Sequence, residues 1–162
     1  MRRTLVLTLL LLLILSSFPY VEAKTFSDSN YQVSIPDNWE VPGFQDNDFL
    51  ASTPNKLLFL IISKNPYDGN KEKSMNEFKS YIKDHPPRFT VVDSGETIVA
   101  KQPTLWGLQT GYNPDKNRKW YMLEYLIHGP DYRYAILFSG WYDSLDDDKP
   151  ILQEILDSFT LL

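Results

Sequence analysis

Few residues in this chain have the types and spacing that catalysis requires. The chain has two histidines, His85 and His128, and no cysteine. Thiol catalysis, iron–sulfur clusters and cysteine zinc sites are therefore excluded. Neither histidine belongs to an H-E-x-x-H or H-x-H pattern, so the spacing gives no support for a histidine metal site. His85 precedes Pro86-Pro87 at an expected helix end and His128 precedes a Gly-Pro turn, which are both ordinary structural positions.

A serine nucleophile has no support either, because the G-x-S-x-G pattern does not occur. Ser80 and Lys83 have the S-x-x-K spacing, but they lie on the outer face of an expected helix. The most acidic stretch, residues 142–148, lacks the glycine and the distal glutamate of a calcium loop. Its carboxylates either flank the start of a helix, where the dipole favours them, or bind a cation weakly. We therefore expect no catalytic, metal-binding or cofactor-binding residues, no cofactor and no enzyme activity, with a hydrolase as the remaining alternative.

One carboxylate needs a structural explanation. Glu124 is the single acid in the apolar stretch 120–127, which reads as a strand. A carboxylate buried there without a partner is costly. We expect Glu124 either to lie on an open face of the sheet or to pair with Arg133 on the neighbouring strand.

Aromatic residues are the remaining indication of a binding surface, because eight of them lie on three successive expected strands. They are Trp106, Tyr112, Trp120, Tyr121, Tyr125, Tyr132, Tyr134 and Trp141. Successive side chains of a strand point to opposite faces, so these rings do not all face one core. Either helices cover them, or some form an exposed patch that binds a partner or an apolar ligand. Trp106 and Trp120 are the candidate partner-binding residues.

Hydrophobic periodicity predicts the elements that position these residues. In the first half we expect a half-buried strand over 31–35, a short strand over 49–52, and a central strand over 57–62 that is covered on both faces. A helix is expected to begin at Ser74, with Ser74 and Glu77 as a capping box, and to end before Pro86-Pro87. Its apolar face contains Met75, Phe78 and Ile82.

The second half predicts a run of strands followed by a helix. The strands are expected over 89–92, 97–100, 105–112, 119–127 and 132–141, with residues 93–96 as the first connection. Connections this short join antiparallel neighbours. A closing helix is expected over 148–158. Together the pattern predicts an α+β domain, an antiparallel meander sheet flanked by helices.

The N-terminal residues have the pattern of an export signal. Arg2 and Arg3 precede the apolar run Leu5–Leu15, and small residues, Val21 and Ala23, occupy the positions before the expected cleavage point. We expect residues 1–23 to be removed as a signal peptide, leaving a single domain over 24–162 in the periplasm or outside the cell. The alternative is a retained anchor, but eleven helical residues span only about 17 Å of a hydrocarbon layer of ~30 Å. No membrane span is expected after cleavage.

Charge limits the partners of this domain. The whole chain has a formal net charge of −5, and without Arg2, Arg3 and Glu22 the remainder has 14 basic and 20 acidic residues, a net charge of −6. An acidic balance argues against binding to nucleic acid or to anionic membrane surfaces.

Two segments resemble the PsbP-like (Mog1/PsbP) family. Residues 31–40, YQVSIPDNWE, are similar to its opening strand and turn, Y-x-[VI]-x-[YIL]-P-x-x-W. Residues 152–159 are similar to its closing helix, which ends in Ser-Phe, and the order of elements between them also agrees. The matched residues have structural roles: Pro36 and Trp39 fix a turn, and Phe159 anchors the last helix.

The resemblance implies an α/β/α sandwich in a family without a common enzyme activity. Members include accessory proteins of the thylakoid lumen and exported bacterial proteins. Only residues 24–30 precede the first expected strand here, so this chain is more similar to the exported bacterial members. We therefore expect an exported, non-catalytic accessory or binding module for a protein of the cell envelope or the exterior. The alternative is a carrier of a small apolar ligand, held in a pocket between sheet and helix.

Overall fold

We describe the fold from a computed structural model that covers residues 22–46, 48–84 and 89–162. The elements, in chain order, are β1 (Ala23–Ser27), β2 (Tyr31–Pro36), β3 (Glu40–Gln45), β4 (Asp48–Ser52), β5 (Leu58–Pro66), α2 (Lys71–Lys83), β6 (Phe89–Val99), β7 (Gln102–Asn113), β8 (Arg118–His128), β9 (Tyr132–Trp141), a 3₁₀ turn (Tyr142–Ser144), α3 (Leu145–Ser158) and β10 (Thr160–Leu161). The expected signal sequence up to Val21, together with His85 and Pro86-Pro87, lies outside these residues. The expected cleavage point after Ala23 falls one residue inside β1.

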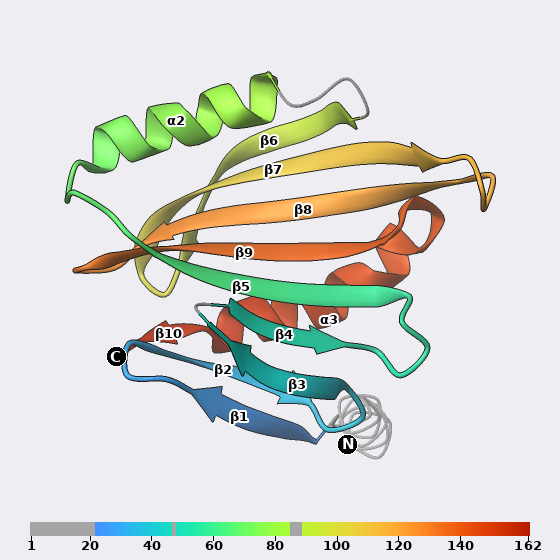
Figure 1. Cartoon of the computed structure of the whole chain (residues 1–162), viewed down its shortest axis with the longest axis horizontal. Helices are drawn as coiled ribbons and strands as arrows, with labels where there is room; N and C mark the ends of the chain where they lie inside the picture. Colours follow the sequence, from blue (N-terminus) through green and yellow to red (C-terminus); the bar gives the residue numbers. More distant parts are fainter. Residues whose placement is uncertain (1–21, 47, 85–88) are drawn as a thin grey trace, which may run out of the picture.

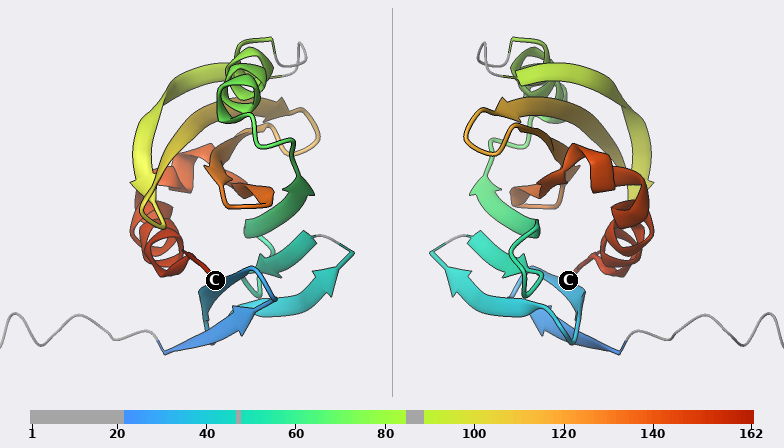
Figure 2. Two further views of the ribbon diagram at one scale, coloured as in Figure 1. Left: turned by 90° about the vertical axis from the view of Figure 1, so that its left-hand side faces the viewer. Right: turned by 90° about the vertical axis from the view of Figure 1, so that its right-hand side faces the viewer.

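Two antiparallel sheets form the domain. The large sheet has seven strands in the order β3-β4-β5-β9-β8-β7-β6, and the small sheet has three in the order β1-β2-β10. Figure 1 shows α2 near the β6 edge of the large sheet and α3 behind the sheet. Figure 2 gives side views of the same arrangement, with the two helices on different sides of the large sheet. The expected α+β class is confirmed.

The main core lies between the large sheet, α3 and the small sheet. Tyr31 stacks on Phe159 with ring centroids 5.2 Å apart and meets Tyr134 edge-on at 5.5 Å. The expected turn after β2 is present, since the Trp39 N–H donates to the Pro36 carbonyl at 2.9 Å and Trp39 is buried. These aromatics therefore join the end of α3 and the small sheet to the large sheet.

The expected capping box at Ser74 is wrong. Helix α2 begins one turn earlier, where the Asn70 side chain accepts from the Lys73 N–H at 2.9 Å. Ser74 is buried in the first turns and accepts a hydrogen bond from Arg133. Asn70 therefore takes the capping role that the sequence pattern assigned to Ser74, and it does so at the Lys73 amide one turn earlier. The apolar face of the helix is as expected, with Phe78 and Ile82 buried.

Two strand expectations are also wrong. Residues 93–96 form no turn, because β6 is one strand with a bulge between Val91 and Asp93, and the chain reverses at Ala100 and Lys101, which both have positive φ. The meander after α2 therefore has four strands. Strand β5 is apolar but not covered on both faces, since Phe59 is 41% exposed. Strands β1, β3 and β10 were not expected, and α3 begins at Leu145, earlier than predicted.

Candidate functional site

A large part of one face of the seven-stranded sheet has no helix over it. Helix α2 packs on Leu105 and Leu126, close to one end of β7 and β8. Figure 1 shows that the right-hand part of the face toward the viewer is left uncovered. We call this region the open sheet face. Its half-buried or exposed apolar residues are Leu50, Phe59, Ile61, Trp120, Met122, Leu137 and Trp141.

Strand register places these residues side by side. Ile61 of β5 lies opposite both Leu50 and Leu137, on the two neighbouring strands. Trp120 lies opposite Trp141. Side chains on the reverse face of the same strands, such as Phe138, are fully buried in the main core. Alternation therefore turns one apolar set toward α3 and leaves the second set on the surface.

The two tryptophans form one end of the open sheet face. The Trp120 ring meets Phe89 edge-on at 5.0 Å, and the Arg118 guanidinium lies 4.6 Å from the Trp141 ring centroid. Both indoles line a pocket of about 390 Å³ that also includes Phe59. Arg118 is itself paired with Asp143 at 2.5 Å. This end thus offers aromatic surface beside a cation whose charge is already balanced.

Trp106 lies on the opposite face from Trp120. Its partner across β7 and β8 is Tyr125, and its indole packs on Gly95, where an added Cβ would lie 3.0 Å from the Trp106 Nε1. Trp106 and Tyr125 line a hollow of about 510 Å³ between the sheet and α3. The structure therefore does not bring Trp106 and Trp120 into one patch.

The other strand aromatics divide between core and surface. Tyr121 and Tyr134 are buried in the main core. Tyr112 is 56% exposed, on the same face as Trp106. Trp141 belongs to the open sheet face, which the sequence did not single out. Side chains alternate between the faces along each strand, so the sequence cannot place Trp141 and Trp120 on the same face until the β8–β9 register is known.

Of the two alternatives for Glu124, the pairing with Arg133 is wrong. Register places Glu124 opposite Leu137, four residues along β9 from Arg133. The Arg133 guanidinium instead donates to Ser74 at 3.2 Å and to Glu77 at 3.1 Å. Glu124 makes no hydrogen bond or ion pair with any residue in the described part of the chain, and its burial beside α2 raises its pKa to about 7. It is a half-buried carboxyl that changes charge near neutral pH.

His128 has the environment of a core residue. It is 2% exposed, and its ring lies 5.3 Å from that of Tyr67. Burial, helped by the charges of Lys71 and Arg133, lowers the pKa of His128. The imidazole is therefore neutral at neutral pH, and within residues 22–46, 48–84 and 89–162 its Nε2 has no hydrogen-bond partner.

The acidic stretch is used structurally. Asp146, Asp147 and Asp148 lie in the first turn of α3, and Asp148 accepts hydrogen bonds from Tyr121 at 3.1 Å and Ser144 at 2.8 Å. Among the described residues, no group of three or more His, Cys, Asp or Glu side chains is placed to hold a metal ion. No helix in the same part of the chain is long and apolar enough to cross a bilayer.

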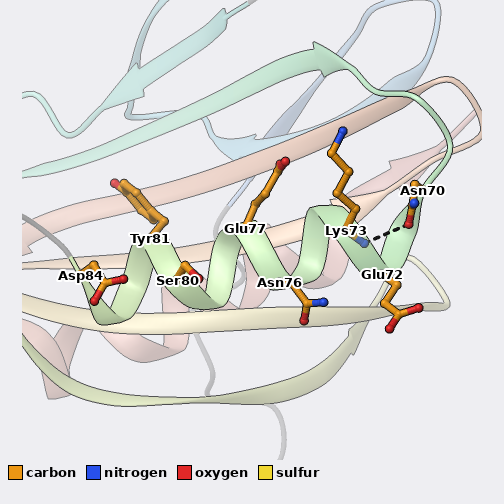
Figure 3. Close-up of a pocket in the computed structure, with 8 residues that line it drawn as sticks. All are labelled: Asn70, Glu72, Lys73, Asn76, Glu77, Ser80, Tyr81 and Asp84. Atoms are coloured by element: carbon orange, nitrogen blue, oxygen red, sulfur yellow. Dashed lines mark hydrogen bonds between the residues drawn. The ribbon is translucent and has the colours of Figure 1, made fainter.

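Helix α2 has two different flanks. Figure 3 shows the polar one, whose eight lining residues come from the helix or its two ends: Asn70, Glu72, Lys73, Asn76, Glu77, Ser80, Tyr81 and Asp84. Lys73 on this flank is paired with Asp68 at 2.9 Å. Because one helix supplies the whole lining, this flank is an exposed surface and not a cleft. The other flank faces β6 across an apolar hollow of about 460 Å³.

An antiparallel sheet with a helix on each face and a small second sheet at one edge defines the Mog1/PsbP-like fold, and this chain has that fold. No family model matches the sequence, and a search of curated proteins found no match. The likeness is visible in solved structures, at sequence identities that establish the fold alone.

Three solved structures illustrate the likeness. CyanoP, the cyanobacterial PsbP of Synechocystis sp. PCC 6803, has a TM-score of 0.64 and 11% identity over 91% of this chain and 96% of its own. LpqN of Mycobacterium tuberculosis, described as involved in cell envelope biogenesis, has a TM-score of 0.66 and 12% identity over 88% and 91%. The Ran-binding protein Mog1p of Saccharomyces cerevisiae has a TM-score of 0.59 and 11% identity over 87% and 96%.

Proposed function

We propose that this protein is an exported, non-catalytic binding module, and that it binds a protein of the cell envelope or the exterior through its open sheet face. The observation that carries the proposal is the apolar surface that extends over four strands, β4, β5, β9 and β8, around a single serine, Ser139. Contiguous apolar patches on a soluble domain mark interaction sites. Export rests on the charged and apolar pattern of residues 1–23, and LpqN, a structural neighbour, is described as involved in cell envelope biogenesis.

The chemistry of the surface indicates an apolar patch on the partner. The charges that border the tryptophans are largely satisfied within the chain, since Arg118 pairs with Asp143 and Lys56 pairs with Glu40. Exposed aromatic rings at the centre of an interface contribute most of the binding energy, whereas exposed ion pairs at its rim contribute little. Recognition is therefore expected to depend on burying Trp120, Trp141 and Phe59.

Photo-crosslinking in the native cell tests this proposal. A photoreactive residue in place of Phe59 should join the chain to one specific protein. The same residue in place of Tyr112, an exposed aromatic on the opposite face, is the matched control and should not capture that protein. Equal capture from both positions, or none from Phe59, would overturn the assignment of the surface.

A second candidate function is a carrier of a small apolar ligand. It is favoured by the two hollows between the sheet and its helices, about 460 Å³ beside α2 and about 510 Å³ beside α3. Both volumes fall within the range of small-molecule sites, roughly 300–1,000 Å³. A stoichiometric small molecule in the native mass of the purified protein would support the carrier.

A further inference from the structure

The hollow beside α2 has an apolar floor and a basic rim. Its floor includes Phe78 and Ile82 of the helix and Leu105 of β7, and its outer wall is β6, which contributes Val91. Lys79 and Lys83, one turn apart on α2, stand at the rim together with Glu96 of β6. We refer to this space as the α2–β6 groove.

Local geometry explains why the groove exists. Helix α2 sits close to β7 because Gly107 has no side chain, and a Cβ there would lie 2.6 Å from the Ile82 Cδ1. Strand β6 is the last strand of the sheet and is bulged between Val91 and Asp93, so no further strand lies beyond it. The helix therefore packs on β7 and β8 and leaves a gap toward β6, where Val91 remains 39% exposed.

The charges of the rim are available to a ligand. The Lys79 Nζ lies 3.8 Å from Glu96, but both side chains are more than half exposed, so this pair is weak. Lys83 has no ion pair with the residues that the structure describes. The polar flank of the same helix, in Figure 3, instead carries three acids, Glu72, Glu77 and Asp84, and one lysine, Lys73, which is paired with Asp68. One helix thus separates an acidic flank from a basic one, in a chain whose net charge is negative.

We infer that the α2–β6 groove binds an anionic amphiphile of the fatty-acid type, with its hydrocarbon chain against Phe78, Ile82 and Leu105 and its carboxylate between Lys79 and Lys83. This inference deepens the second candidate function and is independent of the open sheet face. Burying the chain removes apolar surface of both ligand and groove from water. A carboxylate between two ammonium groups forms charge-assisted hydrogen bonds and displaces only the weak pair with Glu96.

Amide NMR of the purified protein with sodium dodecanoate as the probe tests the inference. Saturable shifts should be confined to the second half of α2 and to the facing parts of β6 and β7. Dodecanol should bind about fivefold to tenfold more weakly, because it has the chain without the charge. The double variant Lys79→Met and Lys83→Met should weaken dodecanoate by the same factor and leave dodecanol unchanged.

A matched pair of variants on β6 distinguishes binding in the groove from binding on the opposite face of the strand. Ser94→Trp fills the groove from β6 and should abolish binding, whereas Thr97→Trp, on the opposite face of the same strand, should not. Shifts at the open sheet face, or equal affinities for dodecanoate and dodecanol, would overturn the inference. Binding to phosphatidylglycerol vesicles that the double lysine variant abolishes would assign the lysines to a membrane surface instead. Cross-linking through Phe59 is unaffected by either result, so the two proposals fail separately.

Discussion

Replacing Glu124 with glutamine should stabilise the protein in alkaline solution and not in acid. The carboxyl lies on the α2 side of β8, has no partner in the described part of the chain, and has a pKa raised by burial from 4.5 to about 7. A carboxyl with a higher pKa in the folded state binds its proton more tightly when folded. Stability is therefore lost as the pH rises from about 4.5 through 7 and is constant above that range.

The magnitude follows from the shift. A carboxyl pKa raised from 4.5 to about 7 corresponds to a destabilisation of about 3 kcal/mol at most, and Glu124→Gln should recover most of this at pH 8. For a domain of this size the melting temperature should rise by about 10 °C. At pH 4.5 the neutral carboxyl of Glu124 and the amide of the variant have similar polarity and size, so the two proteins should have the same melting temperature. Thermal unfolding of both proteins at pH 4.5 and pH 8 measures the difference, and contributions from all other titrating groups cancel.

The matched control is Glu154→Gln, which removes an exposed carboxylate from α3. It should change the melting temperature little at either pH. An equal effect of Glu124→Gln at both pH values, or no stabilisation at pH 8, would refute the argument that burial disfavours the charged form of Glu124.

Three further substitutions test the packing. Lys64→Met should lower the free energy of unfolding by about 2 kcal/mol in urea unfolding, because it leaves the largely buried Asp28 carboxylate without its cation. Adding Asp28→Asn to this variant should restore part of the lost stability. Asn70→Ala should cost about 1 kcal/mol through loss of the α2 cap, whereas Asn70→Asp should not. Gly107→Val should destabilise by about 1–3 kcal/mol by displacing Ile82, and hydrogen exchange should show α2 losing protection before the strands do. An α2 as protected as in the parent would contradict this account of how the helix is seated.

Much of the architecture was predictable because the periodic signal was strong. Strand β9 has the expected bounds, and the turn at Pro36–Trp39 and the apolar face of α2 were read correctly from local pattern. The errors arose where two local signals competed. Asp93-Ser-Gly-Glu96 has turn composition, yet it lies in a bulged edge strand, and the positive φ angles that reverse the chain occur at Ala100 and Lys101, which lack any turn signature.

The open sheet face could be predicted only in part. The density of aromatics on β8 and β9 indicated surplus apolar surface, and Trp120 does lie on that surface. The continuous apolar run over residues 57–62 predicts a strand covered on both faces and therefore a buried Phe59. The same run also fits a strand with one exposed side, which is what the structure shows. For Glu124 the sequence left two alternatives, an open face of the sheet or a pair with Arg133. The pair does not form because register, which the sequence does not specify, separates the two residues.

The central claim is that the open sheet face is the binding surface of this domain. The most direct measurement is the affinity of three forms of the protein for the partner captured through Phe59. The forms are the parent, the double variant Trp120→Ala and Trp141→Ala, and the control Tyr112→Ala. The melting temperature of each form is recorded to show that it is folded. Loss of these two aromatics is expected to weaken binding by about thirtyfold or more, while the control remains within about twofold. A double variant that remains folded and binds as tightly as the parent would contradict the claim.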